Sequence, residues 1–205
     1  MEKIIIKNLS KQYEERKVLN RLNLVLEGGS PNCIMGASGC GKSTLLNILL
    51  GILRADEGEI LIEEKGEIKP WIPEALHPSV VFQEDRLCEE FFALSNLMMV
   101  MRGKESRGEQ RRKCMKLLSA LGLEEFMHTR VSKLSGGQKR RVAIARALAY
   151  EAELFIMDEP FRGLDSENKL LAMRMVKEMT RKKTLIIVTH ENEEADFFGK
   201  NQIKI

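Results

Sequence analysis

A glycine-rich stretch followed by lysine, serine and threonine carries the most specific chemistry in this sequence. It matches the pattern G-x-x-x-x-G-K-[ST] of a phosphate-binding loop and comprises Gly36, Ala37, Ser38, Gly39, Cys40, Gly41, Lys42, Ser43 and Thr44. Glycines let the backbone curl so that successive N–H groups form an anion nest. Lys42 would place an ammonium beside the β- and γ-phosphates, and the Ser43 hydroxyl is a candidate Mg²⁺ ligand. The alternative is a glycine-rich turn that only caps a helix.

Two adjacent carboxylates, Asp158 and Glu159, follow an apolar run at residues 154–157. Ligands of open parallel sheets bind at the carboxyl ends of the strands, so this position suits catalysis. Asp158 would hold Mg²⁺ directly or through water, and Glu159 would orient and deprotonate an attacking water. Pro160 leaves a second interpretation open, in which the pair only caps a helix. The phosphate-binding loop upstream favours catalysis.

A second glycine string follows Leu134 and consists of Ser135, Gly136, Gly137 and Gln138. A serine and two glycines that open a helix make an anion-binding helix N-terminus. A chain with one phosphate-binding loop does not need a second phosphate-binding site for its own nucleotide. We therefore expect this string to serve a nucleotide held by another copy of the chain, with a simple helix cap as the alternative.

Strands and helices must position these residues, and the hydrophobic pattern predicts where they lie. The predicted strands are residues 2–8, 22–26, 33–35, 58–62, 79–83, 154–157, 184–189 and 202–205. The predicted helices run from the phosphate-binding loop to near Leu53, over most of residues 84–149, and over residues 167–182 and 193–198. Alternation in the second strand indicates an antiparallel sheet, whereas the unbroken apolar runs at 154–157 and 184–189 indicate buried parallel strands joined by a crossover helix. This predicts a single α/β domain over residues 1–205, with a helical region at about 84–149 inserted in its core.

Two single residues and one group of methionines have two interpretations each. Tyr13 lies in a polar stretch between the first two predicted strands, either as a packing residue or as an aromatic face for a nucleotide base. Met98, Met99 and Met101 are interpreted as adaptable core residues, with an exposed surface for a partner helix as the alternative. His190 follows a predicted strand, where a single histidine is more often structural than functional.

Composition and charge exclude several classes of protein. The 205 residues are 43% hydrophobic, which is enough for a substantial core, and the net charge of +3 is too mild to indicate nucleic acid binding. The four cysteines form no C-x-x-C pair, which is typical of free thiols in a reducing compartment. The first residues do not show the charged, apolar and small-residue pattern of a secretion signal, and no apolar run is long enough to cross a bilayer. We expect a cytoplasmic chain that reaches a membrane only through a partner.

Six elements taken together make the chain resemble the nucleotide-binding subunits of ATP-binding cassette (ABC) transporters. In chain order they are the loop at 36–44, Gln83, the string at 134–138, Asp158 with Glu159, Gly163-Leu164-Asp165, and His190. The resemblance implies a P-loop NTPase core, ATP and Mg²⁺ as ligands, ATP hydrolysis, and a dimer that sandwiches two ATP molecules. It also implies integral membrane permease subunits as partners and, in an importer, an extracytoplasmic solute-binding protein.

The resemblance also implies roles for individual residues. Tyr13 would stack on the base, and Gln83 would contact Mg²⁺ and the attacking water and sense the permease. His190 would hold the γ-phosphate and support Glu159. Two further groups would act at the dimer interface. One group would contact the nucleotide of the opposite subunit: Ser135, Gly136, Gly137 and Gln138. Asp165 would line the interface.

A finer resemblance concerns residues 81–87, which are similar to the nitrate, sulfonate and taurine group of bacterial importers. In that group a glutamate follows the glutamine and Arg-Leu comes soon after, as with Glu84, Arg86 and Leu87 here. The next residues, 88–92, depart from the usual sequence on the surface that faces the permease. The resemblance of residues 81–87 still makes import the favoured function. The alternatives are an exporter, lipoprotein-release or non-transport membrane complex and, with less support, a soluble ABC ATPase acting on DNA or ribosomes.

Overall fold

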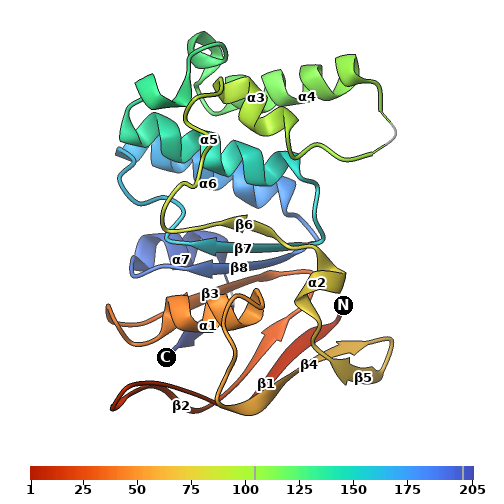
Figure 1. Cartoon of the computed structure of the whole chain (residues 1–205), viewed down its shortest axis with the longest axis vertical. Coiled ribbons are helices and arrows are strands. Elements are labelled where there is room, and N and C mark those ends of the chain that lie inside the picture. The colour runs from red at the N-terminus through yellow and green to blue at the C-terminus, as the bar shows by residue number, and fades with distance from the viewer. Residues whose placement is uncertain (104, 200) are drawn as a thin grey trace. The chain divides into compact units, whose positions relative to one another are not determined.

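The computed structural model (Figure 1) describes residues 1–103, 105–199 and 201–205. The chain divides into two compact units. The first unit comprises Met1–Pro78, Glu153–Asp158 and Arg181–Ile205. The second comprises Ser79–Ala152 and Glu159–Thr180. The region predicted to be helical therefore belongs to the second unit.

The N-terminal part of the first unit is an antiparallel sheet. Its strands are β1 (Lys3–Tyr13), β2 (Arg16–Glu27), β4 (Glu57–Glu64) and β5 (Glu67–Pro70), in the order β2-β1-β4-β5. Along β1, Ile4 and Ile6 are buried while Lys7 is exposed, as one buried face requires. The predicted antiparallel pairing of the first two strands is confirmed. The sequence did not reveal β5, because Ile68 is its only apolar residue apart from the terminal proline.

The remaining strands of the first unit are parallel and form the order β7-β8-β3-β9. They are β3 (Pro31–Met35), β7 (Leu154–Asp158), β8 (Thr184–Val188) and β9 (Asn201–Lys204). Every residue of β7 and β8 is buried, which explains why their sequences show unbroken apolar runs and no alternation. The predicted buried parallel strands and the predicted strand at the C-terminal end are confirmed.

Three helices complete the first unit, namely α1 (Lys42–Leu49), α2 (Pro73–Leu76) and α7 (Asn192–Phe198). Helix α1 contacts β2 and β7, and its Leu45 and Leu49 join a buried cluster with residues of both sheets, including Ile6 and Ile156. Burial of about 0.8 kcal/mol per CH₂ group makes such a cluster a major source of stability. Lys42, the first residue of α1, is thereby fixed on a rigid support.

Helix α1 ends at Leu49, earlier than the predicted end near Leu53. Gly51 has a φ of 70°, which is the left-handed conformation that glycine adopts most readily. The N–H of Ile52 donates to the carbonyl of Asn47 at 2.9 Å, as in a Schellman motif. The helix therefore stops because glycine is available for the left-handed turn, a signal that the apolar pattern alone does not carry.

The second unit contains strand β6 (Ser79–Val81) and the helices α3 (Ala93–Met98), α4 (Arg107–Ala120), α5 (Gly136–Ala149) and α6 (Ser166–Met179), with short 3₁₀ turns at Glu124–Phe126 and Val131–Lys133. Helix α5 contacts α3, α4 and α6, and it lies side by side with α6 in Figure 1. The helical prediction is confirmed for the segments of α3, α4 and α5. It is wrong for residues 84–92, which contain no helix and end in an isolated antiparallel bridge between Phe92 and Arg130.

Two further expectations are corrected. Tyr13 is the last residue of β1, paired with Arg16 across a tight hairpin, and does not lie in a loop between separate strands. Met98, Met99 and Met101 are not core residues, because Met99 is 51% exposed and the other two are half-buried. A surface hollow of about 780 Å³, here named the aromatic hollow, is lined by Phe91, Phe92, Leu94, Ser95, Met98, Met99, Glu105, Arg107, Gln110, Arg111 and His128.

Among the described residues, no helix combines the length and apolarity that crossing a membrane requires.

Candidate functional site

The phosphate-binding loop connects β3 to α1, as its sequence predicts. Gly39 and Gly41 have φ values of 77° and 103°, which glycine adopts without strain. A Cβ at Gly41 would lie 2.7 Å from the Cδ2 of Leu19, and a Cβ at Gly36 would lie 2.4 Å from the carbonyl oxygen of Ile205. Neither distance is possible without displacing neighbouring atoms. The shape of the loop therefore requires glycine at these positions.

Lys42 folds back over this loop. Its Nζ donates to the carbonyl oxygens of Gly36 at 2.9 Å and Ala37 at 2.8 Å, and the residue is 7% exposed. These bonds satisfy the ammonium in a buried position, and phosphate oxygens would be stronger partners for it. Helix α1 has no acidic residue in its first turn, so its positive end is not neutralised locally. The exposed Ser43 in the same turn offers a hydroxyl to a ligand at the loop.

Asp158 and His190 belong to the same edge of the parallel sheet as the phosphate-binding loop. Asp158 ends β7 and pairs with Val188 of β8, and His190 follows β8 by two residues. Strand β3, which leads into the loop, is the next neighbour of β8. Because parallel strands end at a common edge, the structure brings these predicted residues together in the first unit.

A hairpin of the antiparallel sheet also reaches the loop. Tyr13 at the end of β1 is 45% exposed, and the Nζ of Lys11 lies 5.9 Å from the centre of its ring. Arg16, its partner across the turn, donates from Nη2 to the carbonyl of Gly39 at 3.2 Å. The exposed aromatic ring is thus carried by a hairpin that is anchored on the phosphate-binding loop. Sequence reasoning missed Arg16, because no local spacing indicates this contact.

The glycine string forms the N-terminus of α5 in the second unit. Ser135 is the N-cap, and its hydroxyl accepts from the N–H of Gln138 at 3.3 Å. The side chain of Gln138 accepts in return from the N–H of Ser135 at 2.8 Å. This reciprocal capping box leaves the amide groups of Gly136 and Gly137 at an open helix end.

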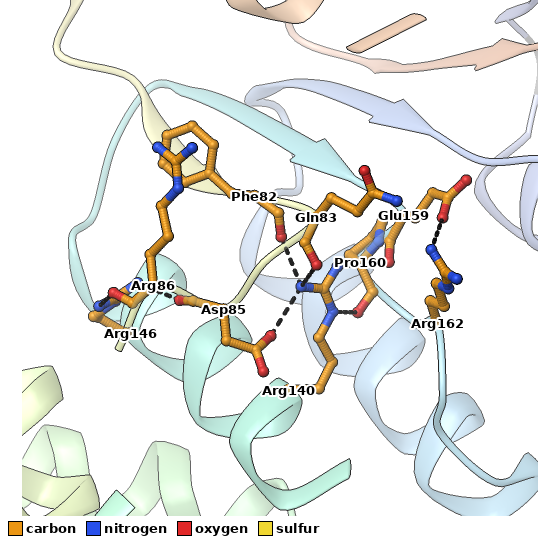
Figure 2. A network of polar contacts seen from close by, with 9 residues as sticks. All are labelled: Phe82, Gln83, Asp85, Arg86, Arg140, Arg146, Glu159, Pro160 and Arg162. Carbon is orange, nitrogen blue, oxygen red and sulfur yellow. Dashed lines mark hydrogen bonds and ion pairs between the residues drawn. The ribbon is translucent and has the colours of Figure 1, made fainter. Parts of the chain in front are cut away.

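Gln83 and Glu159 are both in the second unit, near this helix end. Gln83 is exposed, and Glu159 has a φ of 45°, an uncommon value for a residue with a side chain. Figure 2 shows the carboxylate of Glu159 facing Arg162, whose Nη1 lies 3.3 Å from Oε2. A hollow of about 290 Å³ is lined by Gln83, Asp85, Gly136, Gly137, Arg140, Arg162 and Gly163. The structure therefore brings Gln83 together with the glycine string.

Asp165 has a structural explanation in addition to the predicted one. It is the N-cap of α6, and its carboxylate accepts from the backbone N–H of Asn168 at 2.9 Å. This hydrogen bond and a second one from the Asn168 side chain lower the pKa of Asp165. Its role at a dimer interface stays a prediction.

The donors of the first unit suit Mg²⁺. Ser43 offers a hydroxyl and Asp158 a carboxylate, and Mg²⁺ at nucleotide sites takes one or two protein carboxylates together with phosphate and water oxygens. Within the described part of the chain, no group of three or more His, Cys, Asp or Glu residues could hold a metal ion. A metal at this edge would thus take most of its ligands from nucleotide and water.

Comparisons with known proteins agree with this geometry. The family model described as ABC transporter matches residues 19–162. The chain is similar to the lipoprotein-releasing system ATP-binding protein LolD of Saccharophagus degradans, at 36% identity over 91% of this chain and 86% of that protein. It is also similar to the taurine import ATP-binding protein TauB of Pseudomonas aeruginosa, at 32% identity over 99% of this chain and 78% of that protein. Among solved structures, the dimeric ATP-binding cassette MJ0796 in a post-hydrolysis state with ADP and Pi has a TM-score of 0.82 at 31% identity, covering 98% of this chain and 96% of that chain.

Proposed function

Because this chain belongs to the ABC transporter family, as an ATP-binding subunit with ATPase activity, we propose that two copies of it hydrolyse ATP at their shared interface and drive solute import through a membrane permease. Each ATP lies between the phosphate-binding loop of one copy and the glycine string of the other. Binding of ATP closes the pair, and hydrolysis reopens it.

The glycine string carries this proposal. A Cβ at Gly136 would meet no atom within 4 Å, and a Cβ at Gly137 would meet only atoms at 3.7 Å. Neither glycine is among those with a positive φ. The fold of one chain therefore gives no reason for glycine at either position, whereas the close approach of a phosphate group to the helix end does. A second copy is the natural source of that phosphate.

Nucleotide binding is assigned to the first unit. The amides of residues 36–44 and the ammonium of Lys42 hold the phosphates, and Tyr13 stacks on the base. Ser43 and Asp158 would hold Mg²⁺, with Gln83 of the second unit as a further proposed ligand, and the ion would neutralise charge on the phosphate oxygens. The contact between the Tyr13 hairpin and the loop supports placing base and phosphates on one continuous surface.

Hydrolysis is assigned to Glu159. Its carboxylate accepts a proton from a water molecule whose oxygen forms a bond to the γ-phosphorus, while the bond from that phosphorus to the bridging oxygen breaks and ADP leaves. Gln83 orients the water, and His190 contacts the γ-phosphate and supports Glu159. Residues 135–138 of the second copy donate to the γ-phosphate, and Asp165 lines the interface.

Contact with the permease is assigned to the aromatic hollow of the second unit. Its exposed Phe91, Phe92 and Met99 form an apolar surface that a permease helix would cover. The hollow begins eight residues after Gln83 in the chain. Only a short segment therefore connects the docking surface to the residue that orients the attacking water. The chain would thereby lie on the cytoplasmic face of the membrane.

A disulfide between copies would test the paired arrangement. We expect that a Ser135→Cys, Cys88→Ser chain, treated with a mild oxidant at pH 8 in the presence of ATP, forms a species of twice the chain mass on a non-reducing gel. The native Cys40 supplies the second thiol from the phosphate-binding loop. Burial raises the pKa of Cys33 and of Cys114 to about 11, with Glu194 adding to the effect on Cys33, so both thiols stay protonated and unreactive at this pH.

Two matched variants control this experiment. Removal of Cys40 by Cys40→Ser, or retention of Ser135, should each abolish the doubled species. A disulfide formed within one chain would leave the mass unchanged and would contradict the arrangement. So would a doubled species that forms equally well without ATP.

Purification from native membranes would test the transport function. We expect a tagged chain, solubilised gently in detergent, to retain a stoichiometric integral membrane permease. In an importer the permease would in turn bind a secreted solute-binding protein, and import is favoured by the similarity to the taurine import protein TauB. A complex that instead mobilises lipoproteins would favour the second candidate, which rests on the similarity to LolD. Recovery without any membrane protein, or with nucleic acid or ribosomes, would overturn the transport function.

A further inference from the structure

A buried guanidinium in α5 joins three segments of the second unit (Figure 2). Arg140 is 4% exposed, and each of its nitrogen atoms has an acceptor. Nε donates to the Pro160 carbonyl at 2.8 Å, Nη2 to the Glu159 carbonyl at 2.6 Å, and Nη1 to the Phe82 carbonyl at 2.7 Å. The carboxylate of Asp85 lies 3.0 Å from Nη1 and balances the charge. A buried charge is tolerated only with such complete pairing.

The acceptors lie on the two segments to which the proposed mechanism assigns the attacking water. Phe82 precedes Gln83, and the carbonyl of Gln83 itself is 3.4 Å from Nη1. Glu159 has a φ of 45°, a conformation that costs free energy in a residue with a Cβ and persists only when its surroundings impose it. Arg140 holds the carbonyl groups of Glu159 and Pro160, so it fixes the backbone from which the Glu159 carboxylate projects.

The third segment is the helix that carries the glycine string. Arg140 follows Ser135 by little more than one helical turn, so a rigid helix backbone connects the string to the guanidinium. The planar fork of arginine holds several carbonyl groups in fixed directions, which the single ammonium of lysine cannot do. A change at the helix end therefore reaches the Gln83 and Glu159 segments through one side chain.

We propose that Arg140 is a positioning residue for ATP hydrolysis. It keeps the Glu159 carboxylate and the Gln83 segment in one arrangement relative to the glycine string, so that closure on the second copy sets them together. This inference rests on the proposed function of Glu159 as the base. Arg140 does not itself touch the nucleotide.

The test compares Arg140→Gln with a matched control on the same helix. Arg146 also holds the segment after Gln83, through bonds from its guanidinium to the carbonyls of Asp85 at 2.9 Å and Arg86 at 2.8 Å, but no bond to the Glu159 segment is among its contacts. We expect Arg140→Gln in the full chain to lower kcat about 10- to 100-fold, as a misplaced catalytic group does, while the Kd for ATP changes less than about twofold. Arg146→Gln should lower kcat less than about threefold.

Arg140→Lys should retain part of the kcat that Arg140→Gln loses, because it keeps the charge. The Arg140→Gln, Asp85→Asn double variant guards against misfolding, since it leaves no unpaired carboxylate at the half-buried position 85. It should show the same loss of kcat with a urea unfolding midpoint near that of the wild type. An unchanged kcat in this folded double variant would overturn the inference.

A double-mutant cycle with Glu159→Gln separates positioning from a general structural effect. If Arg140 acts mainly by positioning Glu159, Arg140→Gln should lower the single-turnover rate with labelled ATP much less in the Glu159→Gln background than in the wild type. Losses that multiply would overturn the inference. The cycle also distinguishes two failures. Normal ATP turnover in Glu159→Gln alone would refute the role of Glu159. Loss of turnover in Glu159→Gln together with normal turnover in Arg140→Gln would refute only the role of Arg140.

Discussion

Glu159→Gln is expected to lose ATP turnover while retaining ATP binding. The amide has nearly the shape of the carboxylate but cannot accept the proton of the attacking water, and loss of a general base typically lowers kcat by about 10²- to 10⁴-fold. The phosphate-binding loop is unchanged, so the affinity for ATP should stay within about threefold of the wild type. Because the γ-phosphate then persists between two copies, the variant should accumulate as a closed dimer in ATP.

Two measurements check this result. Steady-state phosphate release gives kcat, and size-exclusion chromatography with light scattering gives the mass of the chain with and without ATP. Glu178→Gln, an exposed glutamate of α6, is a matched control that should hydrolyse ATP normally and form no stable dimer. Hydrolysis by Glu159→Gln within twofold of the wild type would remove Glu159 from the role of base.

The second large effect is expected at Lys42. Lys42→Ala removes the ammonium that would pair with the β- and γ-phosphates and should weaken ATP binding about 10- to 100-fold, since a hydrogen bond to a charged group contributes about 1.5–3 kcal/mol. The carbonyls of Gly36 and Ala37 lose their buried donor as well. The loop therefore loses order together with its charge, and turnover should fall at all but the highest ATP concentrations.

Fluorescent-nucleotide titration measures the loss directly. Lys116→Ala is the matched control, because it removes an exposed lysine of α4 outside the phosphate-binding loop. A urea unfolding curve of Lys42→Ala separates loss of affinity from loss of the fold. Normal ATP affinity in folded Lys42→Ala would contradict the assignment of residues 36–44 as the phosphate site.

The parts of the site that sequence predicts well are those encoded in contiguous residues. The loop around Lys42 has its glycines, its preceding strand and its helix within a single stretch. The cap at Ser135 is likewise local, since Gln138 completes a capping box three residues later. Buried parallel strands such as β7 were predictable because burial on both faces leaves an unbroken apolar run.

The contacts that sequence could not predict join residues far apart in the chain. Arg16 reaches Gly39, and Arg140 reaches both the Phe82 and the Glu159 segments. Nothing in the spacing distinguishes these arginines from exposed helix or strand residues. The exposure of Met99 was missed for a related reason, because apolar character alone does not reveal whether another element of the same chain covers it.

Glycines of the phosphate-binding loop and glycines of the glycine string differ in the space around them, and this difference has a consequence for genetics. Residues 36 and 41 are constrained by contacts inside their own chain, so substitutions there damage the individual copy, and a normal gene beside the altered one should compensate for it. Residues 136 and 137 have room for a side chain, so altered copies should fold, bind ATP and pair with normal ones. Because each such pair would contain a defective site, substitutions at the glycine string should behave as dominant alleles, whereas those in the loop should be recessive.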